Sequence, residues 1–429
     1  MRHQVRLSTM AASVAVVTLA VAGCGAAGTP AGEGRAESST GSSRSAAPVE
    51  AVEIDEEKWF REIRLEDWAA NGGDPAVMQA VLRRIQESTD ERENAQWFDT
   101  VIEPGPGNWI TEWTTVGREA LGKADAARAG GDSRAARDWY RAASIYFTVA
   151  AYPQHRESAH EEDAYRRAKD AYEKAARLGD SGFERLRVPL EGGTFEAFLH
   201  LPKGDGPFPV VLSTGGIDVA KTQNRPLFDR HLAPAGIAMV SFDNAGFGDS
   251  KDWPADHPAM DRLHSAVVDR LREHDLIDAE RIGAVGVSYG GNTVGRLAFT
   301  DERVKAVVSV CGPVHQALDA GLEFIDNLPP QPRAALAARL DVPVGDTERL
   351  AQLVKRTSLV NQGYVGKQRT DTPILVVATA DDPFAPVGDI KRLAASSADG
   401  EVKITGGHGH CPPVKERDQV TWDWLKRHL

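Results

Sequence analysis

The apolar positions between residues 52 and 182 recur at the spacing of an α-helix. Along residues 164–176 an apolar side chain returns every three or four positions: Ala164, Tyr165, Ala168, Ala171, Tyr172, Ala175 and Ala176. That spacing places the apolar side chains on one face of a helix. The same part of the chain holds six of the nine tryptophans: Trp59, Trp68, Trp97, Trp109, Trp113 and Trp139. Such aromatic side chains usually form a core, although some line a pocket at a domain boundary instead. We therefore predict a helical N-terminal domain over residues 52–182.

From residue 183 onward, short β-rich runs alternate with helical patterns. This alternation indicates βαβ units and predicts an α/β fold on a largely parallel sheet over residues 183–429. Eight strands are expected, the first two as a hairpin: 184–188, 194–201, 208–213, 238–242, 281–287, 304–310, 373–378 and 402–405. A partly helical insertion over residues 312–370, containing Pro329 and Pro330, precedes the seventh strand. We predict that this insertion forms a lid.

The first 24 residues combine a basic start, an apolar run and small residues before a cysteine. Arg2 and Arg6 precede an apolar run over residues 13–22, and Gly23 and Cys24 follow it. This order is typical of a signal peptide over residues 1–23, and the apolar run is too short to span a bilayer. Val21 to Cys24 resembles a bacterial lipobox, which implies that Cys24 is lipidated. The alternative is a plain secretory signal with an incidental cysteine.

Residues 24–51, rich in Gly, Ala, Ser and Thr, are expected to form a flexible tether after the lipidated cysteine. The resemblance to a lipobox therefore implies an exported lipoprotein, held at the cell membrane by its N-terminus and facing outside the cytoplasm. The composition, with 41% hydrophobic and 26% charged residues, is that of an ordinary globular chain. With a net charge of −12 and no cluster of Lys and Arg, a nucleic-acid partner is not expected.

Besides Cys24, the chain contains only two cysteines, Cys311 and Cys411. A framework of disulfides therefore does not stabilise this protein. Both cysteines follow predicted strands at the same edge of the sheet, so they could form one bridge, but sequence alone does not give the geometry that bonding requires. We expect two free, half-buried thiols.

A candidate nucleophile lies at Ser288, within the run Gly286-Val287-Ser288-Tyr289-Gly290-Gly291. The motif G-x-S-x-G is weak evidence by itself, and an ordinary glycine turn is the alternative. Here the motif follows a predicted strand and precedes a helical stretch over residues 292–299. A nucleophile elbow requires that context, because small residues let the backbone take a strained turn that lifts the hydroxyl above the sheet.

A serine hydroxyl needs a base and an orienting carboxylate, which should follow it in the chain order of the α/β-hydrolases. The strand 373–378 leads to Asp381 and Asp382. In hydrolases that this segment resembles, a proline lies four residues after the acid, and Pro386 therefore selects Asp382. Asp381 remains the alternative acid, and one of the two aspartates could simply cap the turn.

The last predicted strand leads to a loop that contains two histidines, His408 and His410. Either could be the general base from its position in the chain. Two nearby histidines can also bind a metal, but without a clear third ligand we predict no metal site.

Backbone N–H groups must stabilise the oxyanion of an acyl-transfer intermediate. The loop Gly215-Gly216-Ile217-Asp218 follows the third strand, where this fold places one donor. We predict Gly216 or Ile217 as that donor and Tyr289, the residue after the nucleophile, as the second. A simple glycine turn is the alternative. The turn over residues 243–250 resembles the D-x-x-G-x-G-x-S turn of many hydrolases, and we interpret it as scaffold.

The helical domain, the loop at 215–218, the elbow and the run Gly409-His410-Cys411 together resemble the FrsA-like esterases. From about residue 130 onward the chain is also similar to hydrolases of the 2,6-dihydroxypseudooxynicotine hydrolase type. In that group a helical domain packs over an α/β-hydrolase core, and the base precedes a cysteine. The resemblance therefore implies a triad of Ser288, Asp382 and His410, with His408 as the alternative base.

The resemblance implies a small-molecule substrate, with an ester or a carbon–carbon bond next to a ketone as the bond that is cleaved, and it implies no cofactor. Two other functions are weighed against this one. A prolyl-oligopeptidase-like peptidase would share the motif order, but propeller-like repeats are missing from the sequence. A surface lipoprotein could also use a disabled hydrolase fold for binding, although the complete set of candidate triad residues argues against it.

Overall fold

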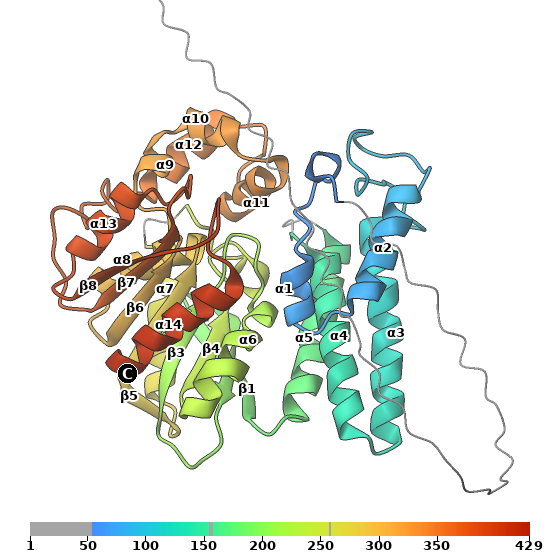
Figure 1. Ribbon diagram of the computed structural model, residues 1–429, viewed down its shortest axis with the longest axis horizontal. Helices are drawn as coiled ribbons and strands as arrows, with labels where there is room; N and C mark the ends of the chain where they lie inside the picture. The colour runs from blue at the N-terminus through green and yellow to red at the C-terminus, as the bar shows by residue number, and fades with distance from the viewer. Residues whose placement is uncertain (1–53, 154–157, 257–258) are drawn as a thin grey trace, which may run out of the picture. The chain divides into compact units, whose positions relative to one another are not determined.

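Eight strands form one mixed sheet in the computed structural model, which describes residues 54–153, 158–256 and 259–429 (Figure 1). The strands are β1 (Gly182–Leu190), β2 (Gly193–Leu201), β3 (Phe208–Thr214), β4 (Ala238–Phe242), β5 (Ile277–Val287), β6 (Val304–Val310), β7 (Ile374–Thr379) and β8 (Gly400–Thr405). Their order across the sheet is β1-β2-β4-β3-β5-β6-β7-β8. β2 pairs antiparallel with β1 and β4, and every other neighbouring pair is parallel. The predicted eight-stranded, mostly parallel sheet is confirmed.

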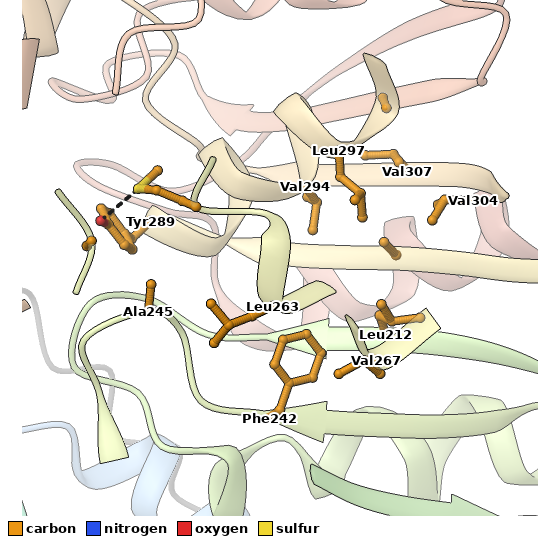
Figure 2. Close-up of a cluster of buried hydrophobic side chains, with 14 of the residues drawn as sticks. Leu212, Phe242, Ala245, Leu263, Val267, Tyr289, Val294, Leu297, Val304 and Val307 are labelled. Atoms are coloured by element: carbon orange, nitrogen blue, oxygen red, sulfur yellow. Dashed lines mark hydrogen bonds between the residues drawn. The ribbon is translucent and has the colours of Figure 1, made fainter. Parts of the chain in front are cut away.

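The central strands are apolar on both faces because helices cover both faces. All seven residues of β3 are buried, a pattern typical of parallel sheets. Leu212 belongs to the same apolar cluster as Leu263 of α7 (Arg262–Arg272) and Val294 of α8 (Tyr289–Thr300), and Figure 2 shows these side chains together. Val211, the preceding residue of β3, instead packs in a cluster with Trp424 of α14 (Val414–His428). Successive side chains of a strand point to opposite faces, so each face has its own core.

Helices both precede the sheet and connect its strands. The helices are α1 (Leu65–Ala70), α2 (Pro75–Glu87), α3 (Trp109–Ala129), α4 (Ser133–Ala151), α5 (Ala159–Arg177), α6 (Arg225–Leu227), α7 (Arg262–Arg272), α8 (Tyr289–Thr300), α9 (Gln316–Asp319), α10 (Leu322–Asn327), α11 (Pro330–Leu340), α12 (Thr347–Arg356), α13 (Val387–Ala395) and α14 (Val414–His428). Helices α9 to α12 make up the predicted insertion between β6 and β7. Pro330 opens α11, a position that proline tolerates because the first N–H groups of a helix have no partner within it.

The N-terminal helices α1 to α5 have an aromatic core. Trp68, Trp109 and Trp113 are almost fully buried, and their ring centroids lie 5.6–6.4 Å apart. Polar side chains cap the N-termini of the longer helices. At the start of α2, for example, the carboxylate of Asp74 accepts hydrogen bonds from the N–H groups of Ala76 and Val77. The last of these N-terminal helices ends at Arg177 and the first strand begins at Gly182, close to the boundary expected between residues 182 and 183. The division into separate domains stays a prediction.

The predicted signal peptide, Cys24 and the predicted tether lie outside the described residues. Within residues 54–153, 158–256 and 259–429, the structure contains no helix with the length and hydrophobicity of a membrane span.

Candidate active site

Ser288 lies in the sharp turn between β5 and α8, with a φ of 53° and a ψ of −115°. A residue with a Cβ rarely adopts this conformation, and the neighbouring glycines make it accessible. A Cβ on Gly286 would lie 2.1 Å from the carbonyl oxygen of Gly290. A Cβ on Gly290 would in turn lie 2.6 Å from the carbonyl oxygen of Gly215. Glycine is therefore required at positions 286 and 290, because the turn that presents Ser288 leaves no room for a side chain there.

The structure brings Ser288, His410 and Asp382 together from three separate loops. The Oγ of Ser288 lies 2.8 Å from Nε2 of His410. On the other side of the ring, Nδ1 of His410 lies 3.0 Å from Oδ1 and 3.1 Å from Oδ2 of Asp382. A proton on Nδ1 would be held by the carboxylate, which leaves Nε2 as an acceptor that faces the serine hydroxyl.

Asp382 is held in place by backbone groups as well as by the histidine. Its Oδ1 accepts the N–H groups of Phe384 and Ala385 at 2.9 Å, and its Oδ2 accepts that of Cys411 at 3.1 Å. Burial raises the pKa of Asp382, but the hydrogen bond and charge of His410 and these backbone donors outweigh burial, so the pKa lies below its ordinary value. The carboxylate is therefore ionised at neutral pH.

The alternative acid and base pair with each other, away from the serine. Nδ1 of His408 lies 3.0 Å from Oδ2 of Asp381, and the His408 side chain is 94% exposed. Hydrogen bonds from His408 and from the backbone of Gly409 lower the pKa of Asp381. The geometry therefore distinguishes the pair Asp382–His410, which contacts Ser288, from the pair Asp381–His408, which does not.

The loop after β3 lies against the nucleophile, as the oxyanion prediction requires. A Cβ on Gly216 would lie 3.5 Å from Cβ and 3.9 Å from Oγ of Ser288. The carbonyl of Gly215 accepts the N–H of Gly290 at 3.2 Å and Nδ2 of Asn244 at 2.6 Å. Because the peptide is trans, these bonds fix the N–H of Gly216 in the opposite direction. Tyr289 begins α8, and its N–H has no acceptor within the helix.

A cavity of about 600 Å³ is lined by Ser288 and His410. Its apolar wall comes largely from the insertion: Leu318, Phe324, Leu328, Leu336, Leu340 and Val354. Polar residues at the start of the helical segment, including Arg64 and Asp67, line another part. No tryptophan of the described residues lines this cavity, and Trp59, Trp68, Trp109 and Trp113 are buried in the helical core instead. Both parts of the chain that were expected to shape the pocket contribute to it.

Comparison with known proteins identifies the family. A model of the family described as Esterase FrsA-like matches residues 41–429. The chain belongs to the FrsA-like esterase family. It is 32% identical to Esterase FrsA of Photobacterium profundum, over 90% of this chain and 92% of that protein. It is 35% identical to Esterase FrsA of Escherichia coli O81, over 86% of this chain and 89% of that protein. This FrsA-like chain is therefore a hydrolase of the α/β-hydrolase fold.

Solved structures share the fold of this FrsA-like chain. The 2,6-dihydroxy-pseudo-oxynicotine hydrolase superposes with a TM-score of 0.69 at 19% identity, over 85% of this chain and 96% of that one. AbyA5 superposes with a TM-score of 0.64 at 23% identity, over 85% of this chain and 94% of that one. At these identities the likeness shows the fold, and the fold includes the helical N-terminal segment as well as the sheet.

Residues without a recognisable sequence motif hold the loop after β3 in this FrsA-like chain. Arg339 of α11 is almost fully buried and donates from Nε to the carbonyl of Ile217 at 2.6 Å. Burial lowers the pKa of Arg339 to about 10, which leaves the side chain charged at neutral pH. Asp218, two residues after Gly216, accepts hydrogen bonds from Arg64, Tyr152 and Gln331. A loop bonded on several sides in this way is preorganised.

The expectation of two free thiols is wrong, because Cys311 and Cys411 form a disulfide in the structure. Their Cα atoms lie 5.1 Å apart, within the range that a disulfide requires. The sequence predicts that both residues lie at the same edge of the sheet, but it does not give the distance between them. The sulfurs lie beside the imidazole of His410, so the bond is part of the surroundings of the candidate base.

Proposed function

We propose that this FrsA-like hydrolase cleaves a carboxylic ester through an acyl-enzyme on Ser288. One observation carries the proposal: the hydroxyl of Ser288 lies 2.8 Å from Nε2 of His410, whose Nδ1 lies 3.0 Å from Asp382. A hydroxyl, an imidazole and a buried carboxylate in this order make up the machinery of nucleophilic acyl transfer.

The proposed reaction has two halves that use the same three side chains. His410 takes the proton of Ser288 as Oγ attacks the ester carbonyl, and the resulting imidazolium then protonates the departing alcohol. Water enters in the second half, gives a proton to His410 and releases the acid from Ser288. Asp382 keeps the proton of the imidazole on Nδ1 and stabilises the imidazolium in both halves. The chemistry proposed needs no cofactor.

The oxyanion formed in each half would accept hydrogen bonds from backbone N–H groups. We assign these donors to Tyr289 and to Gly216 or Ile217. The hydrogen bonds that hold the carbonyls of Gly215 and Ile217 support this assignment, because they fix the direction of the loop before substrate binds. Donors that are already oriented cost no reorganisation in the transition state.

The cavity favours a small-molecule ester with an apolar acyl group. Its wall from the insertion is formed by aliphatic and phenylalanine side chains, which gain free energy by covering a hydrocarbon chain. A volume of about 600 Å³ accommodates a small molecule and is too small for a folded domain. A partner macromolecule is therefore not needed to explain the site.

The proposal is tested with p-nitrophenyl esters of increasing acyl length and five single variants. Ser288→Ala, His410→Ala and Asp382→Asn should each lower kcat by about 10⁴-fold. The matched controls, His408→Ala and Asp381→Asn, should keep most of the wild-type turnover, because this exposed pair does not contact Ser288. A fluorophosphonate should label the wild type at Ser288 and leave Ser288→Ala unlabelled. Near-normal turnover by Ser288→Ala would refute the proposal.

The same panel separates the competing activities. An aryl ketone replaces the ester in one arm, because the sequence resemblance extends to hydrolases that cleave carbon–carbon bonds next to a ketone. Cleavage of the ketone with little ester turnover would move the proposal to that reaction. Peptide cleavage without ester cleavage would favour the peptidase. Failure of the fluorophosphonate to label the folded protein would favour a non-catalytic binding lipoprotein.

We also propose that the protein is exported and anchored to the outer side of the cell membrane through lipidated Cys24. The lipobox-like run at residues 21–24 supports this proposal. Expression with radiolabelled palmitate should label the wild type and not Cys24→Ala, and only the wild type should partition into detergent. Equal partition of the two proteins would instead favour a plain secretory signal.

A further inference from the structure

The residue after the proposed base, Cys411, forms a disulfide with Cys311. Cys311 directly follows β6 and is fully buried. Cys411 lies in the loop between β8 and α14 and lines the active-site cavity. The two cysteines are 100 positions apart in the chain, so the bond is a long-range link. It ties the loop that carries His410 directly to the sheet.

The buried end of the disulfide is fixed next to the nucleophile. The N–H of Cys311 donates to the carbonyl of Val377 in β7 at 2.6 Å. The preceding residue, Val310, accepts the N–H of Ser288 at 2.8 Å. The disulfide therefore fixes the histidine loop relative to the same stretch of β6 that holds the backbone of Ser288.

The other end of the disulfide lies in a loop with several residues in the left-handed region of backbone conformation. Gly407 and Gly409 have φ values of 90° and 74°, and glycine moves freely between such conformations and ordinary ones. Cys411 has a φ of 69° and Cys311 has a φ of 45°, which are disfavoured for a residue with a Cβ. The N–H of Cys411 donates to Asp382, and the hydroxyl of Thr379 donates to the carbonyl of Gly409. These hydrogen bonds and the covalent link together hold Cys411 in its strained conformation.

We propose that Cys411 is a positioning residue whose disulfide with Cys311 holds His410 within reach of Ser288, so that catalysis depends on the oxidised state of this pair. The inference rests on the proposed function, because it assigns the disulfide a role through the proposed base. It also fits an exported protein, since disulfides persist in oxidising compartments.

Reduction would break only the sulfur–sulfur bond. Two electrons and two protons from dithiothreitol convert the disulfide into two thiols, and dithiothreitol becomes its cyclic disulfide. The backbone of Cys411 then loses its covalent link and is held in the left-handed region by hydrogen bonds alone, which we expect to be insufficient. His410 moves with it, away from the Ser288 hydroxyl that lies 2.8 Å from its ring in the oxidised protein. The chemical step slows, while the apolar wall that the insertion contributes to the cavity stays in place.

The first test is the full-length double variant Cys311→Ala/Cys411→Ala. Alanine keeps the backbone N–H that donates to Asp382, so the substitution removes the covalent link and its two sulfur atoms but preserves this hydrogen bond. With p-nitrophenyl butyrate, kcat should fall about 10- to 100-fold, the loss expected for a misplaced catalytic group. KM should stay unchanged, and the rate of fluorophosphonate labelling should fall by the same factor as kcat. Circular dichroism and a thermal melt are used to choose an assay temperature at which the wild type and the double variant are both folded.

The second test is reduction of the wild-type protein with dithiothreitol, followed by thiol titration. Turnover should fall by the same factor as in the double variant and should return on reoxidation. The assay contains EDTA, because the donor atoms of Cys311, His410 and Cys411 lie within 4.8 Å of one another and the freed thiols would bind trace metal. The double variant retains Cys24 and should not respond to dithiothreitol.

Each outcome decides the question. A folded double variant with wild-type kcat, or a fully reduced wild type with unchanged kcat, refutes the positioning role even if the melting temperature drops. If reduction lowers the activity of the double variant as well as that of the wild type, the effect comes from another group, and the positioning role is again refuted. The Ser288→Ala variant separates the two proposals. If it is inactive while the reduced enzyme is fully active, only the positioning role fails, whereas an active Ser288→Ala variant removes the proposed function itself.

Discussion

Arg64 donates two hydrogen bonds to the carboxylate of Asp218, from Nη1 to Oδ1 at 3.0 Å and from Nη2 to Oδ2 at 2.8 Å. The pair joins the start of the helical segment to the loop that contains Gly216. Burial raises the pKa of Asp218, and the charge and hydrogen bonds of Arg64 more than offset it, so the pKa lies below its ordinary value. A planar guanidinium that meets a carboxylate in this way fixes orientation as well as distance.

Replacing Arg64 by lysine should loosen the oxyanion loop while keeping the charge. A lysine ammonium does not reproduce the fork that contacts both oxygens of Asp218. We expect kcat/KM for p-nitrophenyl butyrate to fall about tenfold through misalignment of the loop. The free energy of unfolding in urea should fall by only about 1 kcal/mol. Arg187→Lys, on an exposed position of β1, is the control, and equal kcat/KM in the two variants would contradict the role given to Arg64.

The catalytic candidates could be predicted from the sequence because each one lies in the loop that follows a strand. Parallel strands end at one edge of the sheet, so Ser288, Asp382 and His410 had to meet there once the strands were recognised. The choice between adjacent candidates was different, since Asp381 and His408 follow the same strands. Resemblance to a family favoured His410. Only the hydrogen bonds of the folded loop show that His410 pairs with Asp382 and that His408 pairs with Asp381.

The support of the site could not be predicted, because it depends on contacts between distant parts of the chain. Arg64 lies 154 positions before Asp218, and Arg339 lies 122 positions after Ile217. Neither arginine has a local pattern that distinguishes it from a solvated one. The prediction of two free thiols was wrong for a related reason, since bonding is decided by the distance and direction between two Cβ atoms.

Phe324 of α10 should limit the length of the acyl group. It lines the cavity, and its ring centroid lies 5.7 Å from that of Phe384. Phe324→Ala removes a ring from the wall and so enlarges the cavity. Each additional methylene of the acyl chain that is buried there contributes about 0.8 kcal/mol to binding. We expect the ratio of kcat/KM for the dodecanoate ester to that for the butyrate ester to rise at least about tenfold. Phe299→Ala, which removes a half-buried ring that packs on Tyr364, should leave the ratio unchanged. A shift in both variants would contradict a local effect.

Lys221 should be essential for stability, because it is fully buried between two carboxylates. Its Nζ lies 2.8 Å from Oδ2 of Asp243, which is also fully buried, and it contacts Asp249 as well. Lys221→Met would leave Asp243 without its charged partner and should lower the free energy of unfolding by about 3–5 kcal/mol. Lys203→Met breaks only an exposed pair with Asp180 and should cost at most about 1 kcal/mol. Urea titrations of the two variants measure the difference, and a similar cost for both would contradict the argument.

His264 should make the protein less stable as the pH falls. Burial lowers the pKa of His264 from 6.5 to about 3, so the folded protein keeps the imidazole neutral while the unfolded chain protonates it. Between these two values the unfolded state binds more protons, and stability therefore decreases as the pH decreases. From pH 7.5 to pH 5.0 this group should cost about 2 kcal/mol of unfolding free energy.

Urea titrations of wild type and His264→Gln at the two pH values measure this contribution as a difference of differences. Glutamine retains a polar group near the hydroxyl of Thr214, which lies 3.3 Å from Nε2 of His264, but it has no proton to gain over this range. The variant should be less stable than the wild type at pH 7.5 and should lose about 2 kcal/mol less on acidification. The exposed His160 provides the control, because His160→Gln should keep the wild-type dependence on pH. If His264→Gln lost as much stability as the wild type, the buried imidazole would have to be charged in the folded protein.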